Sequence, residues 1–185
     1  MNRLPEPSPG TIWLVLARHA ARQPMLDLAA RLAQRGALRV LDGGNGFNAY
    51  TVARNLGQWA GESGRELKDA LRRISIARAF TCYQVLTLLS ETPAAPYPTL
   101  VLDLLSTFYD EDVRLDESQR LLESCVGHLR RLSRLAPVVV SARPQASGQP
   151  VQDRSCLVQL LETAAHQVMC EASDPPGDQQ LSLPF

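Results

Sequence analysis

PTLVLDLLSTFYDED, residues Pro98–Asp112, is the stretch of sequence that decides the fold. Thr99–Leu105 is an apolar run that only Asp103 interrupts, with a proline before it and an acidic loop after it. A continuous apolar run of this length predicts a strand buried on both faces, as in a parallel sheet covered by helices. A carboxylate inside such a strand is costly unless it has a partner, so Asp103 is a candidate site residue.

Composition and charge narrow the class of protein. The chain has 185 residues, of which 45% are hydrophobic, which fits one α/β domain, and its formal net charge of 0 gives no strong field toward nucleic acid or an anionic membrane. The four cysteines form no Cys-x-x-Cys pair, which argues against a zinc ribbon or a redox dithiol and suits a reducing compartment. With no membrane-length apolar run and no signal-peptide pattern, we expect a cytoplasmic protein with no metal centre.

Strand and helix patterns alternate along the chain. Strands are expected at residues 11–17, 38–41, 74–79, 99–105, 137–141 and 167–172, the last at an edge. Helices are expected at residues 23–34, 48–60, 65–73, 82–90, 118–135 and 153–165. This alternation predicts an α/β fold with a mostly parallel sheet and helices on both faces. We expect a flexible N-terminus at 1–10, one domain at 11–172 and a flexible tail at 173–185.

The loop after the first expected strand lacks the residues of a phosphate-binding P-loop. That motif is Gly-x-x-x-x-Gly-Lys-[Ser/Thr], because backbone amides must wrap the phosphates and a lysine must reach the outer ones. The loop here is RHAARQP, residues 18–24, and the only lysine, Lys68, lies in another predicted helix. The sequence therefore excludes an ordinary P-loop ATPase, although Arg22 is placed where it could touch an anion.

The turn after the second expected strand has a rival interpretation. Asp42–Gly46, DGGNG, matches the hydrophobic-Asp-x-Gly-x-Gly pattern of S-adenosylmethionine-dependent methyltransferases. Such enzymes usually carry an acidic residue at the end of the next strand to hold the ribose hydroxyls. Here that strand ends IARA, residues 76–79, with no acid. The alternatives are a methyltransferase that uses this turn and a plain strand-to-helix turn.

Several segments together resemble the core of the RecA/RadA recombinases. LDGGNGF, residues 41–47, resembles that family's strand ending in Asp-Thr-Glu-Gly-Thr-Phe, and IARAF, residues 76–80, resembles its Tyr-Ala-Arg-Ala-Phe. LVLD, residues 100–103, resembles the Walker B strand, and residues 121–141 resemble the helix and strand that follow it. The resemblance covers roughly residues 11–172 and implies a RecA-like fold.

The same resemblance implies a domain without ATPase activity. The P-loop position is empty, and the family's catalytic glutamate falls at Gly44, so Asp103 alone remains as a Walker B remnant. The loop 143–152 is short where the family binds DNA. Degenerate relatives of this kind act as binding partners in DNA repair, recombination or translesion synthesis. We therefore expect a non-catalytic protein with no cofactor, whose partner is a recombinase or a lesion-bypass polymerase.

The last six residues, QLSLPF, resemble the hexapeptide Gln-Leu-[Ser/Asp]-Leu-x-[Leu/Phe] that binds the bacterial sliding clamp. Leu183 and Phe185 would fill an apolar pocket with Leu181 packed beside them, while Gln180 would hydrogen-bond at the rim and Ser182 takes the variable polar position. An extended segment after an Asp/Pro/Gly spacer can dock without moving the domain. The alternative is a segment that folds back onto its own core.

The predicted helix 118–135 carries a set of arginines outside its apolar face. Arg120, Arg130 and Arg134 are candidates for a weak or indirect DNA contact, and a solvated helix face is the alternative. A third possibility for the whole chain is a structural subunit of a larger complex with no clamp contact. The sequence alone does not separate that possibility from the clamp-tethered adaptor.

Overall fold

The computed structural model describes residues 4–5, 7–59, 64–145 and 153–170 and shows an α/β fold with one six-stranded sheet. All strand pairs are parallel, and the strand order is β3-β2-β4-β5-β1-β6. The strands are β1 Ile12–Leu16, β2 Leu38–Asp42, β3 Ile74–Arg78, β4 Thr99–Leu102, β5 Val138–Ala142 and β6 Gln167–Cys170. The predicted fold class, a parallel sheet with helices on both faces, is confirmed, and it is consistent with a RecA-like α/β fold.

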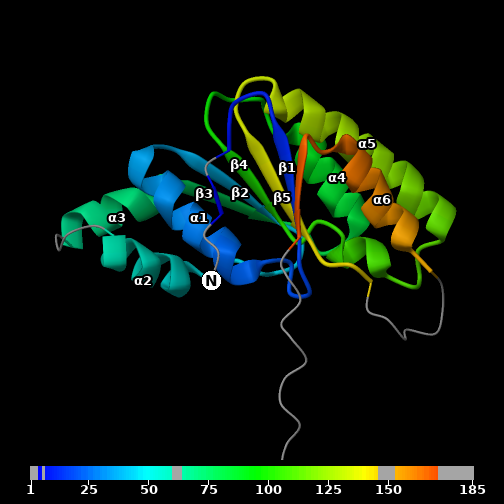
Figure 1. Ribbon diagram of the computed structural model, residues 1–185, viewed down its shortest axis with the longest axis horizontal. Helices are drawn as coiled ribbons and strands as arrows, with labels where there is room; N and C mark the ends of the chain where they lie inside the picture. The colour runs from blue at the N-terminus through cyan, green and yellow to red at the C-terminus, as the bar shows by residue number, and fades with distance from the viewer. Residues whose placement is uncertain (1–3, 6, 60–63, 146–152, 171–185) are drawn as a thin grey trace, which may run out of the picture.

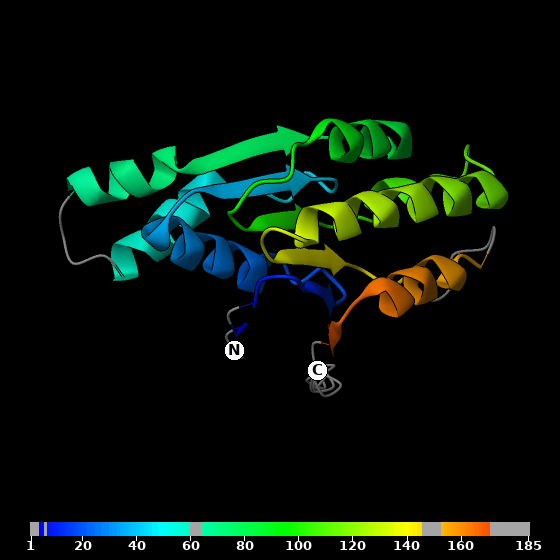
Figure 2. The same ribbon diagram turned by 90° about the horizontal axis from the view of Figure 1, so that it is seen from above.

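Helices cover both faces of the sheet (Figure 1). They are α1 Arg22–Arg35, α2 Ala49–Trp59, α3 Gly64–Arg72, α4 Cys82–Glu91, α5 Leu115–Ser133 and α6 Ser155–Ala164. Helices α1, α2 and α3 pack on one face, and α4, α5 and α6 pack on the other (Figure 2). Among the described residues, no helix has the length and apolar character needed to cross a membrane.

Side chains of each central strand alternate between two separate cores. In β1, Leu14 packs with the α4–α6 side, whereas Trp13 and Val15 pack with the α1–α3 side. Strands β1, β2, β4 and β5 are buried along their whole length. This two-sided burial is the reason that the sequence shows continuous apolar runs rather than the alternating pattern of a half-exposed sheet.

The central strand ends earlier than the apolar run suggests. Strand β4 stops at Leu102, and Asp103 has a φ of 49°, a left-handed conformation that a strand cannot contain. Leu104 and Leu105 are fully buried in the turn, and a 3₁₀ helix follows at Ser106–Tyr109. The prediction of a strand over Thr99–Leu105 is therefore wrong in its second half, because these leucines are apolar to fill the core and not to extend the sheet.

Two neighbouring strand pairs send their chains to opposite faces of the sheet. After β1 the chain enters α1 on one face, while after its neighbour β5 it enters α6 on the other. After β2 the chain enters α2, while after its neighbour β4 it enters α5 on the opposite face. In open α/β sheets, crevices for ligands form at such points, outside the carboxyl ends of the strands. This fold therefore has two places where a ligand crevice is expected.

Candidate functional site

One of these two places holds an open cavity of about 450 Å³. It lies at the carboxyl ends of four strands, and its lining comprises His19, Ala20, Ala21, Arg22, Gln23, Pro24, Gly44, Gly46, Leu102, Asp103, Ser141 and Arg143. The loop between β1 and α1 forms half of this lining. The cavity is therefore the place where a ligand of a fold of this kind is expected.

The β1–α1 loop offers few groups to an anion. Ala20 and Ala21 have φ values of 50° and 48°, so two residues with a Cβ hold the left-handed conformation that glycine usually supplies. The amide of Ala20 donates to Ala17 at 2.9 Å, and the amide of Arg22 donates to His19 at 3.1 Å. Pro24 has no amide hydrogen at all. Since the amides are used or missing, this loop does not form the amide cradle that phosphates require.

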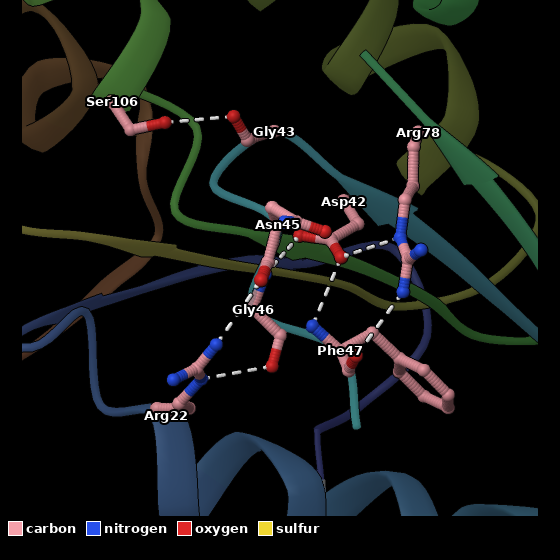
Figure 3. Close-up of polar contacts among 8 residues, drawn as sticks. All are labelled: Arg22, Asp42, Gly43, Asn45, Gly46, Phe47, Arg78 and Ser106. Carbon is pink, nitrogen blue, oxygen red and sulfur yellow. Dashed lines mark hydrogen bonds and ion pairs between the residues drawn. The ribbon is translucent and has the colours of Figure 1, made fainter. Parts of the chain in front are cut away.

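The turn after β2 is built around the carboxylate of Asp42 (Figure 3). Asp42 is fully buried and accepts hydrogen bonds from the amides of Gly46 at 2.8 Å and Phe47 at 2.9 Å. Arg78, at the end of β3, pairs with the same carboxylate at 3.3 Å and donates to the carbonyl of Phe47 at 3.2 Å. Asp42 therefore serves the turn itself and is not free to hold a ligand.

Arg22 ties the β1–α1 loop to this turn (Figure 3). Its Nε donates to the carbonyl of Gly46 at 2.9 Å, and its Nη2 donates to the carbonyl of Asn45 at 3.1 Å. Asn45 has a φ of 51°, which asparagine tolerates better than most residues. The predicted possibility that Arg22 touches an anion thus competes with two hydrogen bonds that the chain already makes.

Direct contacts close the second expected crevice, between β2 and β4. The amide of Gly43 donates to the carbonyl of Leu102 at 2.9 Å, and Ser106 Oγ donates to the carbonyl of Gly43 at 2.7 Å. A Cβ on Gly44 would lie 2.5 Å from both the Cβ and the Oδ2 of Asp103. Gly44 is therefore glycine because the Asp103 side chain occupies that space, and no room is left there for the methionine part of S-adenosylmethionine.

Asp103 lies between the turn and the open cavity and is 8% exposed. Its Oδ2 forms an ion pair with Arg143 Nη2 at 2.9 Å, and its amide donates to Ser141 Oγ at 3.0 Å. Its Oδ1 is buried without a hydrogen-bond partner among the described residues. Burial raises the pKa of Asp103, and the guanidinium of Arg143 opposes that rise. The carboxylate therefore has its charge partner within the chain.

Sequence reasoning missed the pairing of Asp103 with Arg143. Arg143 follows β5 directly, and β5 is next to β4 in the sheet. Because the carboxyl ends of parallel strands meet at one edge, the positions of Arg143 and Asp103 after two consecutive buried strands were a usable signal. The left-handed conformation of Asp103, which directs its side chain beneath Gly44, leaves no such trace in the sequence.

The candidate DNA-contact residues lie on the exposed side of α5, outside the cavity lining. Arg120, Arg130 and Arg134 are exposed, and Arg120 pairs with Glu117 of the same helix. Arg131 instead turns inward and donates to carbonyl groups at the end of α4. Residues 180–185, which carry the clamp-like motif, lie outside the described residues, and within the described ranges no three His, Cys, Asp or Glu side chains gather as a metal site.

A scan of the chain against models of known protein families gave no match, and a search of curated proteins also gave none. Its function is therefore inferred from its own residues and geometry.

Proposed function

We propose that this chain is a non-catalytic RecA-like adaptor in DNA repair, recombination or translesion synthesis, tethered to a bacterial sliding clamp through residues 180–185. The observation that carries the proposal is the ion pair between Asp103 and Arg143 beside the lysine-free β1–α1 loop. In a RecA-like ATPase these two places would hold the magnesium ion and the phosphates. Here an arginine of the same chain neutralises the carboxylate.

The residues at the carboxyl edge do not fit ATP with magnesium. Lys68 lies in α3, away from the β1–α1 loop, and Gly44 stands where the resemblance places the catalytic glutamate. Two arginines line the cavity, but Arg22 is bonded to backbone carbonyls and Arg143 to Asp103. Binding of a nucleotide would have to break these contacts without the amide cradle that normally repays such a loss.

The proposed tether rests on the sequence pattern of the tail. Leu181, Leu183 and Phe185 alternate with other residues, so one side of an extended segment is apolar and suits a hydrophobic groove on the clamp. The domain surface would then carry a recombinase or a lesion-bypass polymerase, and DNA contact would be weak or indirect. Such an adaptor would work in the bacterial cytoplasm, where the clamp is found.

A hydrolysis assay tests the non-catalytic half of the proposal. We expect no release of phosphate from ATP by the purified chain above the level of an Asp103→Asn control. Asparagine suits the left-handed conformation at this position, so this variant removes the carboxylate charge with little backbone strain. ATP turnover by the chain that disappears in Asp103→Asn would overturn this half.

Binding to a bacterial sliding clamp tests the tether. We expect the full chain to bind the clamp and the double variant Leu183→Asp, Phe185→Asp to bind at least tenfold more weakly, since a charge at each apolar anchor leaves a desolvated carboxylate in the groove. Leu135→Asp, at an exposed leucine of the domain, is the matched control and should bind like the unchanged chain. Equal binding by the tail variant and the control would remove the tether from the proposal.

A further inference from the structure

Strand β3 forms an open edge of the sheet with apolar side chains beside it. In the sheet, β3 has β2 as its only neighbour, and Figure 2 shows it along the outer margin of the described fold. Four of the six exposed large hydrophobic side chains among the described residues belong to β3 or follow the carboxyl ends of β2 and β3: Tyr50, Ile76, Phe80 and Tyr83. Phe80 is 68% exposed and Ile76 44%. We call these four residues and β3 the β3 edge.

The backbone of β3 has hydrogen-bonding groups that face away from β2. The amide of Leu38 donates to the carbonyl of Arg73, and the amide of Ala79 donates to the carbonyl of Asp42. In a parallel ladder the groups that face one neighbour come from alternate residues. Ile74, Ile76 and Arg78 therefore direct their amides and carbonyls toward the open side. An edge with unpaired groups and apolar side chains, and with no proline or bulge to protect it, invites an added strand.

The sequence of the tail has the chemistry of such a strand. Apolar residues recur at every second position, Leu181, Leu183 and Phe185, which places them on one face of an extended segment. Pro184 lacks an amide hydrogen, so the residues that bond to β3 must be the alternate set, which is the same three. Residues 171–185 also hold three carboxylates and no lysine or arginine, whereas Arg72, Arg73 and Arg78 are at the ends of β3.

The reach of the tail favours a second copy over the same molecule. The tail begins after β6, at the opposite edge of the sheet, and ten residues separate Cys170 from Leu181. Fully extended, ten residues span at most about 33–36 Å. A strand added outside β3 lies six strand spacings from β6, about 29 Å in a straight line. Within one molecule the tail would be almost taut across the loops at the carboxyl edge.

We propose that the β3 edge of one copy binds residues 181–185 of a second copy as an added strand. The contact joins two different surfaces, so each copy can bind one neighbour at its edge and another through its tail, and the assembly has no fixed end. The same tail residues are those proposed to bind the sliding clamp. A tail held by a neighbour is therefore unavailable to the clamp, and clamp binding would release copies from the assembly.

Two full-length variants and their mixture test this contact by sedimentation velocity across a concentration series. Ile76→Asp places a charge on the β3 edge and keeps the tail, whereas Leu183→Asp alters the tail and keeps the edge. We expect the unchanged chain to grow with concentration beyond a dimer, and each variant alone to associate at least tenfold more weakly. The mixture should form dimers and stop there, because only one functional edge and one functional tail can meet.

Two further measurements keep the outcomes distinct. Phe80→Ser, at a more exposed position, serves as a second edge variant, and circular dichroism melting shows whether either edge variant folds. Ile76→Asp should bind the sliding clamp as the unchanged chain does, so loss of clamp binding would contradict the tether and not this contact. A monomer at all concentrations, an edge variant that associates like the unchanged chain, or a mixture that stays monomeric would each overturn the inference.

Discussion

The two crevices at the carboxyl edge of the sheet are built in opposite ways. Between β2 and β4, the amide of Gly43 bonds to Leu102, Ser106 bonds to Gly43, and Asp103 fills the space beside Gly44. At the carboxyl end of β1, next to β5, a cavity of about 450 Å³ remains. One crevice has become part of the core, while the other keeps the shape of a ligand site.

The difference shows that a pocket and a catalytic site are separate properties of this fold. The shape at the end of β1 follows from strand order, because the chain leaves β1 and β5 toward opposite faces. The chemistry depends on side chains, and there the charged groups bond to one another or to the backbone, as Arg22 and Arg143 do. A cavity at the expected place is thus compatible with a domain whose task is to bind a protein.

The largest expected effect is at the centre of the closed crevice. Asp42→Ala removes the acceptor for the amides of Gly46 and Phe47 and the partner of Arg78. Leaving these donors without a partner should lower the free energy of unfolding by about 2–4 kcal/mol. Urea unfolding followed by circular dichroism measures this loss as a lower midpoint with an unchanged slope.

The comparison requires the open crevice to respond differently. His19 is exposed and lines the cavity, and His19→Ala should change the free energy of unfolding by less than about 0.5 kcal/mol. A similar loss in both variants would mean that the β1–α1 loop is as integral to the core as the Asp42 turn. The distinction between a closed and an open crevice would then be wrong.

A smaller effect is expected from filling the space beside Gly44. In Gly44→Ala the new Cβ would lie 2.5 Å from the Asp103 side chain, so the turn or β4 must shift. Overpacking of this kind should cost about 1–3 kcal/mol. Gly57→Ala is the matched control, because this glycine lies within α2 with no atom within 4 Å of an added Cβ.

The control should move in the other direction. Alanine is favoured over glycine inside a helix by about 0.5–1 kcal/mol, so Gly57→Ala should raise the urea midpoint while Gly44→Ala lowers it. A neutral result at Gly44 would show that Asp103 can leave that space easily. The crevice between β2 and β4 would then be able to open for a ligand, and the methyltransferase interpretation would regain support.

The sequence predicts the layers of this protein better than it predicts the carboxyl edge. Continuous apolar runs such as Val138–Ala142 identify strands buried on both faces, and the structure confirms them. Run length does not locate the strand end at Leu102, because the buried Leu104 and Leu105 of the turn have the same apolar character. The glycine pattern predicted a turn, but it could not tell whether a cofactor or a side chain fills the space beside Gly44.

The smallest expected effect concerns Asp103, which lines the cavity and also fills the closed crevice. Burial raises its pKa above the ordinary value of 3.8, so the folded chain holds this proton more tightly than the unfolded chain does. The contribution of this carboxyl group to stability is therefore most favourable below pH 3.8 and is lost as pH rises through the raised folded pKa.

Asp103→Asn replaces the carboxylate by a neutral group of the same shape, and asparagine tolerates the φ of 49°. The variant should match the unchanged chain near pH 3.5 and exceed its stability at pH 7 by up to about 1 kcal/mol, since Arg143 offsets part of the burial cost. Urea midpoints of both chains across this pH range measure the difference. If the variant is instead less stable at pH 7, the ion pair with Arg143 outweighs burial, and Asp103 holds both crevices in place by its charge.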